Sequence, residues 1–88
     1  MVSQTVQVQN KIGFHARPVA LLIESAKKYA CNIRVTSGDI TVDIRSIIDM
    51  LRLQVKMGDE VTIHADGADE EKALQEIVSI ICDKFGEE

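Results

Sequence analysis

Apolar residues recur along this chain with two different periods, and the order of the two periods restricts the folds open to it. In four short runs every second residue is apolar, which is typical of a strand with one buried face. In three other segments apolar residues return every three or four positions, as on one side of an amphipathic helix. The alternating runs lie at 5–9, 33–35, 40–44 and 61–65, and the helical segments run from 16 to about 28–30, from 47 to 53 and from 70 to about 84.

The resulting order is strand, helix, strand, strand, helix, strand, helix. It predicts an α+β fold, an open-faced two-layer sandwich with a four-stranded antiparallel sheet and three helices on one face. The other face of the sheet should be solvated, because strands covered on both faces would read as unbroken apolar runs. The 88 residues suffice for one domain, which we place at 1–88.

The first and last predicted helices have a clear apolar side, and the second and third each begin with a residue suited to capping. Ser46 and Asp69 are predicted to cap the second and third helices, with Glu70 and Glu71 opposing the dipole of the third. The apolar sides are expected at Pro18, Leu21, Leu22, Ser25, Ala26 and Tyr29 in the first helix, and at Ala73, Leu74, Ile77, Ile80, Ile81 and Phe85 in the last.

The composition of the chain argues against several classes of function. The net charge is −4 and aromatic residues make up 3% of the chain, which argues against nucleic-acid binding. Apolar runs are short, so we expect no membrane insertion, no signal peptide and a cytoplasmic protein. Cys31 and Cys82 lie in no metal-ligand spacing and are expected to be buried, reduced thiols; no metal or cofactor is predicted. His64 is expected to be a solvated strand residue.

The segment from Gly13 to Pro18 carries the chemistry. Pro18 suits the first turn of a helix, so the helix should begin near Ala16 and place His15 at or just before the N-cap. Unbonded backbone N–H groups and the helix dipole there favour an anion and a neutral, nucleophilic imidazole. The Arg17 guanidinium matches phosphate oxygens, so His15 and Arg17 together can accept and hold a phosphoryl group. Taken alone, however, a histidine near a helix start is more often a surface or capping residue.

The short second helix offers two further candidates. Ser46 reads as an N-cap and, less strongly, as a regulatory phosphorylation site, since a helix N-terminus tolerates the added charge. So short a helix cannot bury all of its apolar side chains, which include Ile47, Ile48 and Leu51. An aliphatic patch that stays exposed beside the His15 loop would serve as a docking surface.

Over essentially its whole length the chain resembles the histidine-containing phosphocarrier family, HPr, of the bacterial phosphoenolpyruvate-dependent sugar phosphotransferase system. The resemblance rests on four segments: Gly13-Phe14-His15-Ala16-Arg17-Pro18, Arg45-Ser46-Ile47-Ile48, Lys56-Met57-Gly58-Asp59-Glu60-Val61 and Ala65-Asp66-Gly67-Ala68-Asp69-Glu70-Glu71.

The resemblance implies a carrier rather than an enzyme. Nδ1 of His15 would be phosphorylated by the first enzyme of the system and would pass the group to the A domains of sugar-specific permeases, with help from the charge of Arg17. Phe14, Ile47, Ile48 and Leu51 would form the docking patch. Ser46 matches the serine modified in many Gram-positive relatives by an ATP-dependent kinase/phosphorylase, whose product acts with a catabolite-control transcription factor. A monomer is expected.

Four residues depart from the usual family pattern. Where this chain has Ile12, family members usually carry a small polar residue, and where it has Asp49 they carry glycine or lysine. They carry serine or threonine in place of Arg52 and glycine in place of Gln54. Ile12 and Gln54 would flank His15, and Asp49 would place a negative charge beside the docking patch. These departures leave open a second hypothesis, a regulatory binding module that carries no sugar-transport flux. A small-ligand-binding domain is a third and weaker one.

Overall fold

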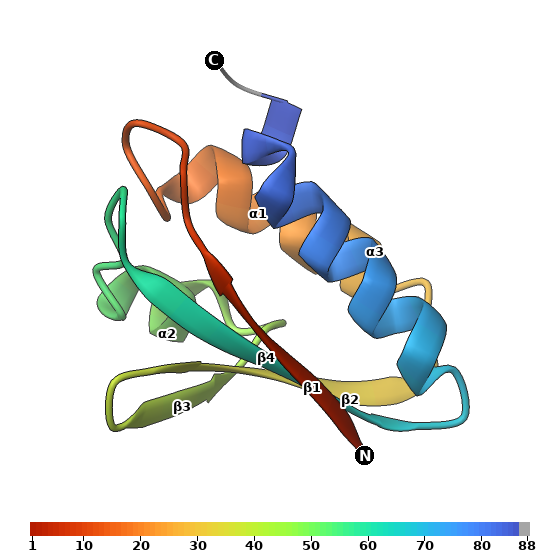
Figure 1. The fold of residues 1–88 in the computed structure, drawn as a ribbon. Helices are drawn as coiled ribbons and strands as arrows, with labels where there is room; N and C mark the ends of the chain where they lie inside the picture. Colours follow the sequence, from red (N-terminus) through yellow and green to blue (C-terminus); the bar gives the residue numbers. More distant parts are fainter. Residues whose placement is uncertain (87–88) are drawn as a thin grey trace.

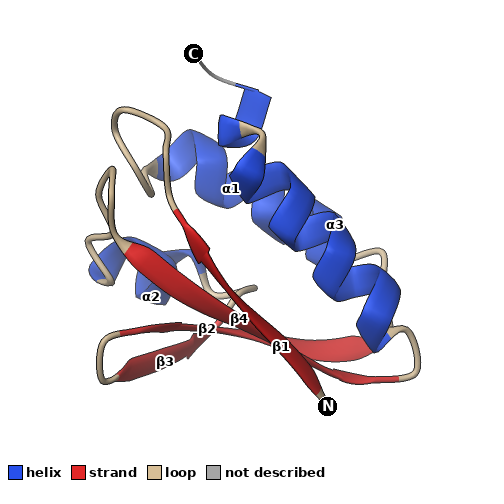
Figure 2. Cartoon of the chain, viewed as in Figure 1, coloured by secondary structure: helices blue, strands red, loops and turns tan. Residues whose placement is uncertain are grey.

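The computed structural model describes residues 1–86 as a sheet with helices packed against it (Figures 1 and 2). The strands are β1 (Val2–Gln7), β2 (Cys31–Ser37), β3 (Ile40–Asp43) and β4 (Glu60–Gly67). The helices are α1 (Ala16–Ala26), α2 (Ile47–Arg52) and α3 (Glu70–Cys82), followed by a short turn, η1 (Lys84–Gly86). The strand order is β1-β4-β2-β3 and every neighbouring pair is antiparallel. The α+β fold predicted from the two periods is confirmed.

Apolar cross-strand pairs build the core. On the helix-covered face the paired residues are Val6 with Val61, Val35 with Ile63 and Ile33 with Ala65. All six side chains are at most 7% exposed. α1 and α3 lie over this face, and α2 packs near the end of the sheet against α1 and β3 (Figure 1).

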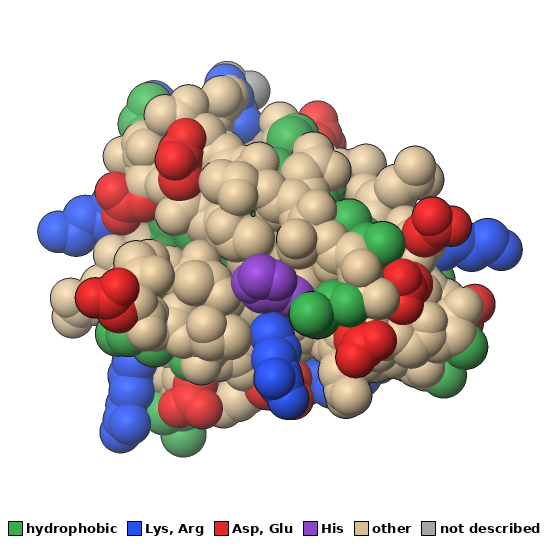
Figure 3. All heavy atoms as spheres, turned by 60° about the horizontal axis from the view of Figure 1, so that its bottom comes forward, with side chains coloured by type: hydrophobic (Ala, Val, Ile, Leu, Met, Phe, Trp, Pro, Cys, Tyr) green, Lys and Arg blue, Asp and Glu red, His purple; other side chains and the backbone are tan. Residues whose placement is uncertain are grey.

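The opposite face of the sheet is polar and open. Hydroxyl pairs join neighbouring strands, with 2.8 Å between the side-chain oxygens of Thr5 and Thr62 and 2.8 Å between those of Thr36 and Thr41. His64 is half-buried there, with its Nε2 2.9 Å from the Thr36 hydroxyl. Figure 3 looks toward this side and shows a histidine next to a basic side chain, with hydrophobic and acidic side chains nearby.

Several element boundaries differ from the predictions. β1 covers 2–7 rather than 5–9, because Val8 leaves the ladder to exchange backbone hydrogen bonds with Gly58 and Asp59 at 2.7 and 2.8 Å. α1 stops at Ala26 rather than near 28–30. The amides of Lys28 and Tyr29 turn back to carbonyls three residues earlier, which tightens the chain.

The burial predicted for four residues was wrong. Leu21 is 44% exposed and Ile80 half-buried, because both face a groove between α1 and α3. Cys82 is exposed and Cys31 half-buried, although both are unpaired thiols as expected, and burial raises the pKa of Cys31.

Asp69 occupies the N-cap of α3, but within residues 1–86 its side chain makes no capping bond. Glu70 instead accepts the Gly67 amide at 3.2 Å.

Within residues 1–86 no helix is long and apolar enough to cross a membrane. The same residues contain no cluster of three or more histidine, cysteine or carboxylate side chains that can hold a metal ion.

Candidate functional site

His15 occupies the N-cap of α1. Its backbone is extended, with φ −122° and ψ −175°, and its carbonyl accepts the first helical hydrogen bond from Val19 at 3.1 Å. The side chain is half-buried. The change of period and Pro18 therefore located the helix start correctly.

The N-terminus of α1 is suited to an anion. The N–H groups of Ala16 and Arg17 belong to the first turn, where a helix supplies no acceptor, and Pro18 contributes no N–H. The first turn has no carboxylate to repel a phosphate. Arg17 is exposed and two residues from His15. The site thus offers a nucleophilic nitrogen, backbone donors and one exposed cation.

A buried asparagine shapes the loop before His15. The Asn10 side chain is fully buried, and its Nδ2 donates to the Gly13 carbonyl at 2.8 Å. The Gly13 amide in turn donates to the Asn10 carbonyl at 3.2 Å. This two-way link closes the loop into a compact turn. Sequence reasoning missed Asn10, whose only signal was a polar residue directly after a strand.

The loop is also tied to the segment that follows α2. The Phe14 amide donates to the Val55 carbonyl at 3.0 Å. Gly13 has φ +79°, and a Cβ on it would lie 2.3 Å from the Val55 oxygen. Only glycine combines this φ with so close an approach. The approach of Val55 to Gly13 was not expected from the sequence.

Two of the unusual residues lie on these same loops. Gln54 precedes Val55, is exposed and has φ +53°, a left-handed conformation that suits glycine. Ile12 precedes Gly13 and is 67% exposed. Both are therefore on segments that hold His15.

The aliphatic residues of α2 form an exposed patch. Ile47, Ile48 and Leu51 are 41%, 63% and 36% exposed, while Met50 anchors the helix in the core at 0%. Phe14 differs from the other predicted docking residues. It is 6% exposed and packs edge-to-face on Phe85, with 5.9 Å between ring centroids. Its ring supports the His15 loop from beneath and offers a partner little surface.

Ser46 takes the N-cap position of α2, with its carbonyl 2.9 Å from the Met50 amide. The predicted capping bond to its hydroxyl oxygen is absent among the described residues, although φ −94° and ψ 99° lie in the extended region usual for an N-cap. Its neighbour Arg45 has a structural role that the sequence did not reveal. Arg45 Nη2 donates to the carbonyls of Ala26, Tyr29 and Cys31 at 2.7, 3.1 and 3.1 Å, and so closes the C-terminus of α1.

Comparison with known proteins agrees with this geometry. A family model described as "PTS HPr component phosphorylation site" matches residues 2–83. The chain belongs to the HPr phosphocarrier family. Members of this family are carriers rather than enzymes, and they act with the first enzyme and the permease A domains of the sugar phosphotransferase system.

Individual HPr relatives are similar over nearly full length. The phosphocarrier protein HPr of Treponema pallidum is 35% identical, with 100% of both chains covered. The HPr-like protein Crh of Bacillus subtilis is also 35% identical, covering 92% of this chain and 95% of its own. A crystal structure of HPr from Thermoanaerobacter tengcongensis has a TM-score of 0.96 at 40% identity, covering 100% of this chain and 99% of that one.

Proposed function

We propose that this protein carries a phosphoryl group on His15, which it receives from the first enzyme of the phosphotransferase system and delivers to permease A domains. The observation that carries the proposal is the position of His15 at the N-cap of α1, next to the donors of Ala16 and Arg17. Membership of the HPr family supports the same function. A cytoplasmic, monomeric protein is part of this proposal.

The transfer step is a direct displacement. The lone pair of the neutral His15 Nδ1 attacks the phosphorus of the first enzyme's phosphohistidine while the bond from phosphorus to the donor nitrogen breaks. The donor imidazole leaves with the electron pair. Backbone N–H groups at the start of α1 and the Arg17 guanidinium stabilise the charge on the equatorial oxygens. Delivery to a permease domain repeats the step with His15 as donor.

The test is incubation with phosphoenolpyruvate and the first enzyme, followed by intact-mass measurement. We expect one acid-labile, base-stable phosphate on the wild-type protein and none on His15→Ala. His64→Ala is the matched control, since it removes the other histidine and should still be labelled. Labelling of His15→Ala under these conditions would disprove the assignment.

A regulatory module is the second candidate. The similarity to the HPr-like protein Crh, together with Ile12, Asp49 and Gln54, favours it. In this alternative Ser46 is phosphorylated by an ATP-dependent kinase, and the product binds a catabolite-control transcription factor. Complementation of a strain that lacks its own phosphocarrier separates the candidates: growth on a transported sugar supports the carrier and excludes a purely regulatory protein.

A further inference from the structure

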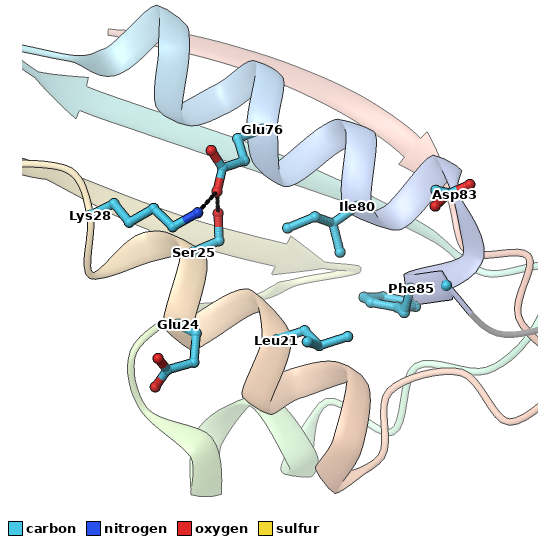
Figure 4. A pocket seen from close by; sticks show the side chains of 9 residues that line it. Leu21, Glu24, Ser25, Lys28, Glu76, Ile80, Asp83 and Phe85 are labelled. Atoms are coloured by element: carbon cyan, nitrogen blue, oxygen red, sulfur yellow. Dashed lines mark hydrogen bonds and ion pairs between the residues drawn. The ribbon is translucent and has the colours of Figure 1, made fainter.

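A groove of about 340 Å³ lies between α1 and α3. Figure 4 shows Leu21, Ile80 and Phe85 directed toward this space from α1, α3 and η1. Leu21 is 44% exposed although it lies among the apolar positions of α1. Leu21 and the half-buried Ile80 therefore form an apolar floor in the groove, whereas the Phe85 ring beside them is buried.

The rim of the groove is acidic. Glu24, Glu76 and Asp83 line it, with Lys28 as the one cation among its lining residues. Lys28 forms an ion pair with another lining residue, because its Nζ lies 3.0 Å from Glu76 Oε2. Glu24 has only a solvent-exposed pair with Lys27 at 3.6 Å, which neutralises it weakly.

The end of α3 adds to this negative charge. Asp83 is the C-cap of α3, whose last turn contains no basic residue, so the carboxylate lies at the negative end of the helix dipole. Within residues 1–86 no ion pair to Asp83 is formed. Lys84 follows directly, but it lines a different hollow together with Gln7, Met57 and Gly58. The groove thus combines an apolar floor with two carboxylates at its edge, Glu24, which is weakly paired, and Asp83, which has no ion pair within residues 1–86.

This combination indicates the chemistry of its occupant. A drug-sized ligand is usually buried over most of its surface, and a groove flanked by exposed side chains such as Leu21 and Glu24 does not enclose one in that way. A partner protein can bring further contact area from outside the groove. We propose that the groove between α1 and α3 is a second docking surface, which binds a protein segment carrying an aliphatic or aromatic side chain next to lysine or arginine.

The surface is separate from the candidate phosphotransfer site. Its lining contains no residue of the His15 loop or of the α2 patch. The proposal therefore goes beyond the carrier function and does not depend on it.

The experiment is selection of binding peptides from a displayed library of random 12-residue sequences against the full chain. Counter-selection against the triple variant Leu21→Gln/Glu24→Gln/Asp83→Asn removes peptides that bind elsewhere. We expect enriched peptides to contain an aliphatic or aromatic residue beside lysine or arginine. A synthetic copy of the most enriched peptide should then shift the backbone amide resonances around Leu21, Ile80 and Phe85 in a saturable titration.

Variants test each part of the surface. We expect the Kd of that peptide to rise about fivefold in Glu24→Gln/Asp83→Asn and about tenfold in Leu21→Gln. Glu60→Gln/Glu71→Gln removes two exposed carboxylates outside the groove and should leave the Kd within about twofold. His15→Ala should also bind normally, so failure of the carrier function and failure of this proposal are distinguishable.

Four results would overturn the proposal. The first is the absence of any enriched peptide after counter-selection. The second is enrichment of peptides without lysine or arginine, and the third is a Kd that the groove variants leave unchanged. The fourth is a homodimer in sedimentation analysis that Leu21→Gln abolishes, since the groove would then be covered by a second copy of the chain. Circular dichroism of every variant ensures that loss of binding is compared among folded proteins.

Discussion

The backbone amide of Phe14 donates a hydrogen bond to the carbonyl of Val55 at 3.0 Å, and this contact joins the His15 loop to the segment after α2. The two residues are far apart in the chain, yet this bond links the loop that contains His15 to the segment that follows α2. The proposed phosphate acceptor and the aliphatic patch of α2 therefore lie on segments that are joined by a backbone hydrogen bond.

Gly13→Ala should damage this junction. The added Cβ would meet the Val55 oxygen at 2.3 Å, and φ +79° is itself unfavourable for alanine. We expect the free energy of unfolding in urea to fall by about 3 kcal/mol, from strain and overpacking together. Gly38→Ala is the control, because Gly38 has φ +60° but open space around it, and it should lose only about 1 kcal/mol. Equal losses would show that the close approach to Val55 is unimportant.

Gln54→Gly should relieve backbone strain next to the candidate site. Gln54 has φ +53°, and glycine adopts this conformation without a Cβ clash, so unfolding should become harder by about 0.5 kcal/mol. If the glutamine side chain also crowds His15, the rate of His15 phosphorylation rises. Lys84→Gly, at φ +55° in η1, shows how much stability the same backbone change contributes at a second position. An unchanged rate in Gln54→Gly would remove crowding as an explanation for this unusual residue.

Ile48→Glu tests the docking patch. Ile48 is 63% exposed, so the change should hardly affect stability, but it places a charge where the first enzyme is proposed to bind. The KM for the protein as substrate of the first enzyme should rise about tenfold, equivalent to about 1.4 kcal/mol of binding, with kcat nearly unchanged. Ile40→Glu, at a β3 residue that is 55% exposed, should leave KM as in the wild type. A parallel rise in both variants would argue against a specific patch.

Glu76 should make stability depend on acid pH. Hydrogen bonds from Ser25, from Tyr29 Oη at 2.6 Å and from Lys28 lower the pKa of Glu76 to about 2 from an ordinary 4.5. Because the folded-state pKa is lower than the unfolded one, the carboxylate stabilises the protein fully above pH 4.5 and progressively less as the pH falls toward 2.

Glu76→Gln measures this contribution. At pH 7 we expect a loss of about 1–2 kcal/mol, less than the full shift implies because the side chain is 29% exposed. Urea unfolding curves of variant and wild type should converge as the pH approaches 2. The control Glu60→Gln changes an exposed carboxylate and should show no such convergence. A difference that stays constant from pH 7 to pH 2 would contradict the role of the Glu76 charge.

Arg45→Met should loosen the end of α1. The variant loses the donor to the carbonyls of Ala26, Tyr29 and Cys31, and we expect about 2 kcal/mol less stability in thermal and urea unfolding. Arg45→Lys keeps a charge at the same carbonyls and should lose about 0.5 kcal/mol. If lysine is as damaging as methionine, the planar guanidinium rather than the charge is what the helix end requires.

Local pattern was sufficient for the elements and for the position of His15. The two apolar periods identified all four strands and all three helices, because burial of one face acts on every second or every third and fourth residue within a short segment. The switch between periods, with Pro18 just after it, located the helix start and so the N-cap histidine. Exposure of Ile47, Ile48 and Leu51 was likewise inferred from the shortness of one helix.

The remaining features depend on contacts between distant segments. Whether Val8 continues a strand or pairs with the turn at 58–59 depends on where β4 begins, and the end of α1 depends on Arg45. Leu21 has the spacing of a core residue, yet α3 passes at a distance that leaves it beside an open groove. Asn10, by contrast, is a polar residue that is fully buried within the loop before His15.

The sequence by itself thus determined which segments are strands and helices and that a histidine begins the first helix, because these follow from the side-chain period and from backbone chemistry within a few residues. Only the tertiary structure decided what surrounds that histidine, which apolar residues stay exposed and which charged side chains form ion pairs. Those outcomes arise from the packing of elements whose mutual distance and orientation no local pattern encodes.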